Sequence, residues 1–390
     1  MHIVFFDGNT RPHLLPLTFT RPVAQLRVGI LTIAEKWQKY WGETQVSFFT
    51  QDYLSGKFPL VESNDAMWIN GAICPTKSLV ERVKNLQTGQ CLVSGDEILA
   101  ARAPGARQMP NSADLQPQDC PVSDYTFIDR PWKIFSQNGI ELQRDYDLIT
   151  QGRSSAPLSD TNTLIGDQIF AEDGVQAEAA TFNSTTGPIY LGKNSAVMEG
   201  SVVRGGFALG EASQLKLAAK IYGPTTIGPH SKVGGEVNNS VIQGYSNKGH
   251  DGFLGNSVIG EWCNLGADTN ISNLKNNYAP VKLWSYVKKG FEKTGQQFCG
   301  LIMGDHSKCG INTMFNTGTV VGVSANIYGA GFPRNFIPSF SWGGAQGLAE
   351  YRFEKAMETA QLVMQRRGME LTATEKDILK QVFEQTAPAR

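Results

Sequence analysis

The chain has 390 residues, of which 41% are hydrophobic and 18% charged, the balance of a globular protein long enough for two or three domains. Its 35 Lys and Arg residues nearly cancel its 36 Asp and Glu residues, so no bulk field favours nucleic acid or an anionic membrane. We see no signal peptide, no apolar stretch of membrane-spanning length and no CxxC spacing among the six cysteines. We therefore expect a cytoplasmic protein with no nucleic-acid or membrane partner.

Strand and helix patterns alternate through the first 150 residues. Short apolar strands are expected at residues 3–6, 46–49 and 67–69, and helices at 25–41 and 77–86. This alternation predicts a parallel sheet covered by helices, and we assign residues 1–150 to one α/β domain. Residues 102–124 are polar and rich in proline, which indicates a long loop.

Farther along the chain, an aliphatic residue recurs at every sixth position. The unbroken series comprises Leu191, Val197, Val203, Leu209, Leu215, Ile221, Ile227 and Val233. After a slip it resumes as Phe253, Ile259, Leu265 and Ile271, and again as Met303, Cys309, Phe315, Val321 and Ile327. A period of six fits a coil of three short strands, each turning one side chain inward, with glycine at the corners. We therefore predict a left-handed parallel β-helix over residues 160–340.

Two interruptions and a tail complete the chain. Residues 236–250 shift the repeat and 275–300 break it, and we expect such loops to gather on one face and carry binding chemistry. Residues 345–390 are expected to be helical. Arg366-Arg367-Gly368 is typical of a helix end, and Thr372 with Glu375 of a capping box that opens the next helix.

The run from Asn247 to Gly255, continuing through Ile259-Gly260 and Asn264-Leu265-Gly266-Ala267, resembles the acetyltransferase half of the GlmU family. Residues 14–22 look like a divergent, Bacteroidetes-type branch of that family. The resemblance implies a bifunctional enzyme with a truncated, Rossmann-like nucleotidyltransferase domain before the β-helix. Its substrates would be an amino-sugar phosphate, such as glucosamine 1-phosphate, a nucleoside triphosphate and acetyl-CoA. Mg²⁺ would be required if nucleotidyl transfer is active. Active sites between adjacent prisms imply a homotrimer.

The resemblance also implies roles for residues of the second half. His250 corresponds to the general base, and imidazole titrates near neutral pH, as deprotonation of a sugar amine requires. Glu236 would hold its tautomer, and the backbone N–H of Ala267 would donate to the thioester oxyanion. The sugar would be bound by Lys220, Asn238, Phe253, Asn264 and Asn273. Phe253 stands where the family has tyrosine, Asn238 where it has lysine, and Lys220 where it has a phosphate-binding arginine.

The first half departs further from the nucleotidyltransferase pattern. Gly8 and Arg11 occupy the turn that would cover the nucleotide phosphates, with Arg21 and Arg27 as further phosphate ligands. Asn70 is a further nucleotide-binding candidate. Asn70 and Ala72 stand where a metal-binding Asp is expected, so the metal ligand is unknown and Asp7, Asp145 and Asp147 are candidates.

Two other functions remain open. The first is an acyltransferase whose N-terminal domain is not catalytic. The second is a zinc-dependent β-helix carbonic anhydrase, which would use His230, His250 and His306 as ligands.

Overall fold

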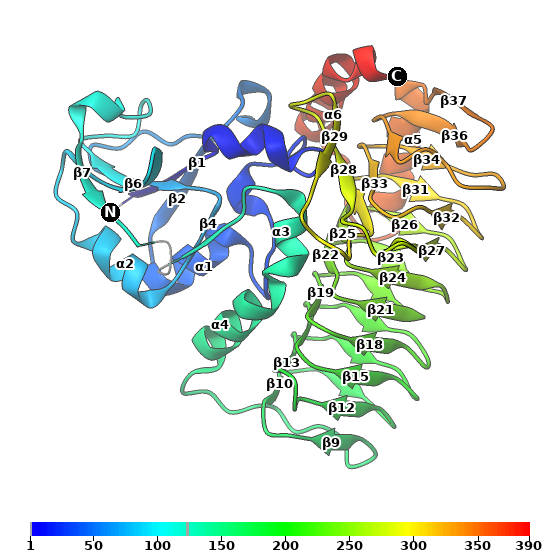
Figure 1. Ribbon diagram of the computed structural model, residues 1–390. Helices are drawn as coiled ribbons and strands as arrows, with labels where there is room; N and C mark the ends of the chain where they lie inside the picture. The colour runs from blue at the N-terminus through cyan, green and yellow to red at the C-terminus, as the bar shows by residue number, and fades with distance from the viewer. Residues whose placement is uncertain (1, 122–124) are drawn as a thin grey trace.

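The computed structural model describes residues 2–121 and 125–390. Figure 1 shows an α/β domain lying against one side of a tall column of stacked coils, with a pair of helices near the C-terminal end of the column. The column is the expected left-handed parallel β-helix, and the fold class is confirmed in all three parts.

The sheet of the N-terminal domain has the strand order β2-β1-β3-β6-β5-β7. These strands are β1 (His2–Phe6), β2 (Gln45–Phe49), β3 (Ala66–Asn70), β5 (Gln90–Ser94), β6 (Glu97–Ala103) and β7 (Gln116–Asp119). β1 pairs in parallel with β2 and β3, whereas β6 runs antiparallel to β3 and β5. The predicted parallel sheet is therefore corrected to a mixed one. The turn between β5 and β6 holds only Gly95 and Asp96, and so tight a turn can join only antiparallel strands.

The domain also contains helices and short turns. They are η1 (Gly8–Leu14), η2 (Val23–Gln25), α1 (Ile33–Trp41), η3 (Asp52–Leu54), α2 (Lys77–Lys84), η4 (Ser112–Asp114), α3 (Pro131–Ser136) and α4 (Asn138–Thr150). A small antiparallel pair joins β4 (Ile73–Pro75) to β8 (Tyr125–Phe127).

The helix predicted at 25–41 is shorter than expected. α1 begins only after Thr32, whose side chain forms a capping box with Glu35. The preceding N–H groups of Ile30 and Leu31 donate to the carboxylate of Asp145, so they are held outside the helix. The loop predicted at 102–124 also needs correction because it contains η4 and β7, while its residues 122–124 lie outside the described part of the chain.

The β-helix has three faces. The first face contains β10 (Ile169–Ala171), β13 (Ile189–Leu191), β16 (Phe207–Leu209), β19 (Thr225–Ile227), β22 (Val241–Gly244), β25 (Val258–Glu261), β30 (Leu301–Met303), β33 (Thr319–Val321) and β35 (Phe336–Ile337). The second face contains β11 (Gln176–Ala177), β14 (Ala196–Val197), β17 (Gln214–Leu215), β20 (Lys232–Val233), β23 (Asn247–Lys248), β26 (Asn264–Leu265), β31 (Lys308–Cys309), β34 (Asn326–Ile327), β36 (Ser341–Gly344) and β37 (Gly347–Glu350). The third face contains β9 (Thr163–Ile165), β12 (Thr181–Asn183), β15 (Val202–Arg204), β18 (Lys220–Tyr222), β21 (Glu236–Asn238) and β24 (Phe253–Gly255), and the pair β27 (Asn270–Ile271) and β32 (Met314–Phe315) follows them in the chain.

The interior of the prism is filled by the hexad residues. Every member of the first series is at most 2% exposed and belongs to one core cluster, as predicted. The second series needs one correction, because Leu254 is buried and Phe253 lies partly exposed on the outer surface. Lys248, 2% exposed, is the inward residue of β23.

The N-terminal domain docks on the first face of the prism. The outward residues Val241, Val258, Ile302 and Val320 belong to the core cluster of that domain. The insertion at 275–300 forms the hairpin β28 (Lys282–Ser285) and β29 (Gly290–Lys293), and its Leu283 joins the same cluster. Binding chemistry was predicted for this insertion, but the structure shows that it strengthens the domain contact.

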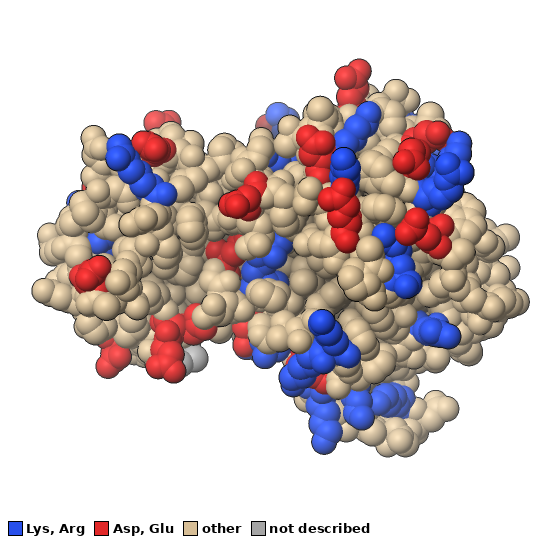
Figure 2. All heavy atoms as spheres, turned by 90° about the horizontal axis from the view of Figure 1, so that it is seen from above, with Lys and Arg blue, Asp and Glu red and all other residues tan. Residues whose placement is uncertain are grey.

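The C-terminal helices are α5 (Phe353–Gln365) and α6 (Ala373–Gln385), followed by η6 (Ala387–Ala389). The capping box of Thr372 and Glu375 is present as predicted, and Gly368 has a φ of 69° after α5. Both helices pack against a cluster that includes Trp262 and Phe340 of the prism. In the described parts of the chain no helix combines the length and hydropathy of a membrane span. Figure 2 shows acidic and basic side chains interspersed on the face seen from above.

Candidate active site

His250 lies at the corner where the second and third faces meet. The corner spans residues 249–252, between β23 and β24. Gly235, with a φ of 69°, makes room for it, because a Cβ there would approach the carbonyl oxygens of His250 and Gly252 to 2.9 Å. The side chain of His250 is exposed and makes no hydrogen bond to any described residue. The imidazole is therefore accessible to a substrate.

A hollow of about 580 Å³ surrounds this corner. Its lining residues are Met198, Lys216, Leu217, Gly234, Gly235, Gly249, His250, Asp251, Ala267 and Asp268. The N–H of Asp268 donates to the carbonyl of Asp251 at 3.0 Å, which ties the two corners together. Among the described residues no acceptor takes the N–H of Ala267. The hollow thus combines an accessible imidazole with an unused backbone donor, which is what acyl transfer to an amine requires.

Three sequence candidates lie side by side on the third face. The Cα register places Lys220, Glu236 and Phe253 in one row across β18, β21 and β24. The hydroxyl of Tyr222 donates to Glu236 at 2.7 Å, and burial together with this bond raises the pKa of that hydroxyl. Within the described chain no hydrogen bond joins Glu236 to His250. The structure therefore does not show the contact through which Glu236 was predicted to hold the tautomer of His250. Tyr222 was missed, although its place two residues after Lys220 puts it on the same face of β18.

The amide candidates divide between two faces. On the third face, a Cβ at Gly255 would meet both the ring of Phe253 and the amide of Asn273 at 2.6 Å, so these side chains adjoin there. The side chain of Asn273 donates to that of Asn256 at 2.8 Å, and the side-chain amide oxygen of Asn238 accepts from the side chain of Asn239. Asn264 is exposed on the second face. One chain therefore does not bring Asn264 beside the other four sugar-site candidates.

A second hollow, of about 360 Å³, lies at the carboxyl ends of β1 and β2. It is lined by Phe6, Asp7, Gly8, Asn9, Phe49, Thr50, Gln51, Asp96, Glu97, Ile98 and Met109. Gly8 therefore lines this hollow. Asn70 is fully buried behind Gly8 and bonds the N–H of Ala72 and the carbonyl of Ile98. The carboxyl edge of parallel strands is where α/β sheets commonly bind ligands.

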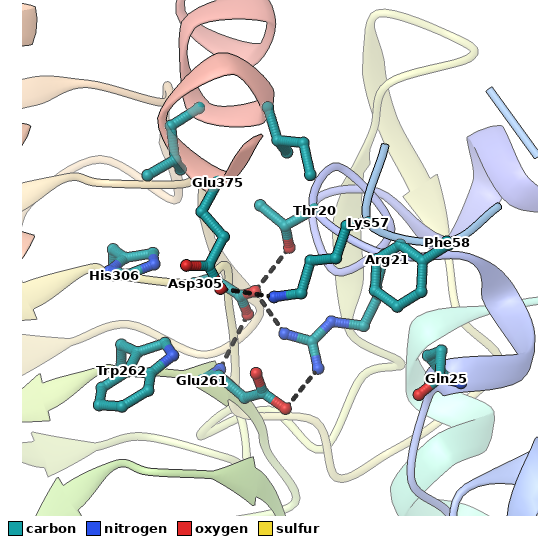
Figure 3. A pocket seen from close by; sticks show the side chains of 12 residues that line it. Thr20, Arg21, Gln25, Lys57, Phe58, Glu261, Trp262, Asp305, His306 and Glu375 are labelled. Carbon is teal, nitrogen blue, oxygen red and sulfur yellow. Dashed lines mark hydrogen bonds and ion pairs between the residues drawn. The ribbon is translucent and has the colours of Figure 1, made fainter. Parts of the chain in front are cut away.

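The three arginines predicted to reach a nucleotide phosphate are engaged elsewhere. Arg11 donates to the carbonyl of Thr18 and the hydroxyl of Tyr53, and Arg27 to the carbonyls of Ile30 and Gln243. Arg21 points across the domain boundary to Glu261 and Asp305 of the prism, as Figure 3 shows. We therefore correct these predictions, because each guanidinium is used to fix the chain or the domain contact.

The metal candidates also do not converge. Asp145 is 2% exposed and paired with Lys36 at 2.6 Å, and Asp147 is exposed on α4, where Gln143 donates to it. Asp7 lines the hollow, but Val23 and Thr50 donate to its carboxylate, and burial raises its pKa. In the described residues no three His, Cys, Asp or Glu side chains form a metal-binding group.

The three histidines of the zinc alternative are separated. His230 and His306 belong to a stack of rings with Tyr245 and Trp262 between them, whereas His250 lies at the corner described above. Burial lowers the pKa of His306 to about 3. The described structure thus offers no three-histidine site of the carbonic anhydrase type.

Comparison with known proteins gives one family model and several relatives. Residues 3–154 match the family model described as sugar nucleotidyl transferase. The chain is 38% identical over 87 residues to the bifunctional protein GlmU of Methanocaldococcus jannaschii, covering 22% of this chain and 21% of that protein. It is 38% identical over 93 residues to a bifunctional sugar-1-phosphate nucleotidylyltransferase/acetyltransferase of Sulfurisphaera tokodaii, covering 24% and 23%. A solved UDP-N-acetylglucosamine acyltransferase of Arabidopsis matches with a TM-score of 0.28 and 15% identity, covering 54% of this chain and 80% of that one.

The matched segments are thus short relative to these proteins. The chain spans between a fifth and a quarter of the length of the two curated relatives. The resemblance to the GlmU-like family is nevertheless confirmed by the family model and the relatives together.

Proposed function

From this likeness to GlmU-like proteins we propose that the β-helix transfers an acetyl group from acetyl-CoA to the amine of an amino-sugar 1-phosphate, with glucosamine 1-phosphate as the first candidate. The observation that carries the proposal is the hollow that holds both His250 and the unused N–H of Ala267. The sugar-1-phosphate specificity draws on the bifunctional relatives.

The proposed reaction uses each of these groups once. The imidazole of His250 accepts a proton from the sugar amine as its nitrogen attacks the thioester carbonyl. The N–H of Ala267 donates to the oxygen that becomes negative in the tetrahedral intermediate. The C–S bond then breaks, and CoA leaves as a thiolate that takes the proton from the imidazolium. Lys220, Glu236 and Phe253 begin the strands of the third face that follow this edge of the prism, and Asn273 lies beside Phe253; together they would bind the sugar.

The division of the candidates between two faces supports a homotrimer. Asn264 lies on the second face of the prism and Glu236 on the third, so within one chain they are on different outer surfaces. A neighbouring copy would bring a second face against a third face, so that Asn264 of one chain meets the sugar bound by another. The same contact would cover two exposed apolar side chains, Leu217 at this edge of the prism and Val202 on the third face. The cytoplasm, where acetyl-CoA and nucleotides are available, is the expected compartment.

For the N-terminal domain we propose nucleotidyl transfer to the sugar 1-phosphate. The family match over residues 3–154 supports it, as does the hollow at the carboxyl ends of β1 and β2. Asp96 and Glu97 line that hollow and could hold Mg²⁺, which would neutralise triphosphate charge during the transfer. The second candidate is an acyltransferase whose N-terminal domain only supports the prism. It is favoured by the engagement of Arg11, Arg21 and Arg27 in structural contacts.

A product assay by mass spectrometry tests both activities. Purified protein receives acetyl-CoA with a panel of amino-sugar 1-phosphates, and separately UTP and other triphosphates with Mg²⁺. We expect an N-acetylated sugar phosphate, and a loss of about 10²- to 10⁴-fold in kcat for His250→Ala. His230→Ala, at a different corner of the same prism, is the matched control and should keep its activity. Absence of acetylation in the wild type would reject the main proposal, and absence of nucleotidyl transfer alone would leave the second candidate.

A further inference from the structure

One interior position of the prism holds an ionisable side chain among apolar ones. The inward column of the second face runs through Val197, Leu215, Val233, Lys248, Leu265, Cys309 and Ile327. Lys248 is 2% exposed, as buried as its neighbours in the column. The neighbouring coils place the apolar residues Val233 and Leu265 at this position, whereas burial of an ammonium group costs free energy. The presence of a lysine therefore indicates a role other than stabilising the prism.

The ammonium of Lys248 is bonded to the corner that carries His250. Its Nζ donates to the carbonyl oxygen of His250 at 2.6 Å and to that of Asp251 at 3.2 Å. Both carbonyls therefore turn toward the interior. His250 itself lines the hollow outside the prism, and its side chain is exposed there.

Few charges face this ammonium. The groups that act on it are Asp251 and Asp268 at the two corners and the thiol of Cys309 in the column. Burial outweighs their attraction and lowers the pKa of Lys248 to about 8. The ammonium is thus held at a cost to folding, and what it stabilises is the turn from Gly249 to Gly252.

We propose that Lys248 is a positioning residue that holds the His250 turn from inside the prism, and that it acts on catalysis only through His250. The inference rests on the proposed acyl transfer. Hydrogen bonds from a charged donor are roughly twice as strong as neutral ones, which suits the fixing of a two-carbonyl turn. Neighbouring coils hold the far end of the turn, where Asp268 donates to the carbonyl of Asp251 and Glu236 to that of Gly252, but open space surrounds the Cβ position of Gly249, and among the described residues only Lys248 donates to the carbonyl of His250.

The first test replaces the ammonium without emptying the interior. Lys248→Met keeps an unbranched apolar chain of similar length, and Leu215→Met in the same column is the control for repacking. We expect kcat of Lys248→Met to fall about 10- to 100-fold, because small displacements of a catalytic group are costly, while KM for both substrates stays within two-fold. Leu215→Met should stay within two-fold of the wild type in both constants. An unchanged kcat in Lys248→Met, or a loss that appears mainly in KM, overturns the proposal.

The second test separates positioning from a general structural effect. If Lys248 acts only through His250, the double variant Lys248→Met/His250→Ala should be no slower than His250→Ala alone. Losses that multiply in the double variant would show an independent role and reject the inference.

Hydrogen exchange gives a readout that does not depend on activity. We expect amides of residues 249–253 to exchange at least ten-fold faster in Lys248→Met than in the wild type and in Leu215→Met, while the rest of the prism is unchanged. If the wild type proves inactive in acyl transfer but this local loosening is seen, the proposed function fails and the structural role of Lys248 stands. Unchanged exchange in this segment refutes the role itself.

Discussion

Arg21 and Asp305 form a buried ion pair between residues 284 positions apart, one in the N-terminal domain and one in the β-helix. The same guanidinium bonds Glu261 at 2.8 Å, and the hydroxyl of Thr20 donates to Asp305. Burial opposes the charge of Arg21, but Asp305 and Glu261 outweigh it and raise its pKa. Figure 3 shows these side chains meeting at the boundary between the two domains. Together with the apolar first face, they fix how the N-terminal domain sits on the prism.

Replacement of this arginine should loosen the domain contact. Arg21→Met leaves the buried Asp305 without its cation, and we expect the free energy of unfolding to fall by about 3–5 kcal/mol. Denaturant unfolding followed by hydrogen exchange should then show the N-terminal domain opening before the prism. Arg107→Met is the control, because Arg107 pairs with Glu62 at 3.3 Å where both side chains are over 70% exposed, and it should cost less than about 1 kcal/mol. Equal losses in the two variants would contradict the importance of the buried pair.

A second buried cation holds α1 to α4. Lys36 is 1% exposed and contacts Glu141 at 3.1 Å and Asp145 at 2.6 Å. Lys36→Met would leave Asp145 buried without a cation and Glu141 paired only with Arg144, and we expect a loss of about 3–5 kcal/mol in denaturant unfolding of the N-terminal domain. Lys39→Met changes an exposed residue of the same helix and should be near neutral. A Lys36→Met protein as stable as the wild type would show that this buried ion pair does not hold α1 to α4.

A charged side chain introduced into the prism interior should destabilise the fold. Ile227→Asp places a carboxylate at a fully buried position with no partner, at a cost of several kcal/mol, comparable to the stability of a domain. We expect insoluble protein, or protein without the cooperative melting of the wild type by circular dichroism. Lys193→Asp, at an exposed position near the same first face, should melt normally. Normal melting of Ile227→Asp would show that the assigned interior is wrong.

The stability of the chain should depend on pH through Lys248. Its pKa is lowered from 10.5 to about 8 in the folded state. Below pH 8 both states carry the proton and the folding penalty is present in full. Between pH 8 and 10.5 the unfolded state binds more protons, so this residue makes the free energy of unfolding rise with pH.

Lys248→Met should lose that part of the rise, as measured by urea unfolding at pH 7, 8, 9 and 10. Lys308, whose pKa burial also lowers to about 8, is present in both proteins and cancels in the comparison. Parallel pH profiles for the two proteins would show that Lys248 is not strained.

Much of the fold follows from sequence alone, because a narrow prism accepts one aliphatic side chain per short strand and glycine where backbones approach. Residues such as Leu209 and Ile227 are therefore placed inside by their period. The capping box at Thr372 is equally local, since both of its partners lie within one turn. The corner motif around His250 also identified the hollow that it lines.

What the sequence by itself could not determine is which surfaces meet. The corners vary in length, so the register shifts by one residue and Leu254 replaces Phe253 in the interior. Arg21, Arg27 and Asp145 looked available for phosphate or metal, but each has a partner in a segment more than a hundred positions away. An ionisable side chain reaches whichever opposite charge folding brings beside it, and only the tertiary structure decides that. In the same way, the sequence shows only that Lys248 interrupts an apolar column. The role proposed for it depends on the tertiary structure, in which its ammonium donates to the carbonyl of His250.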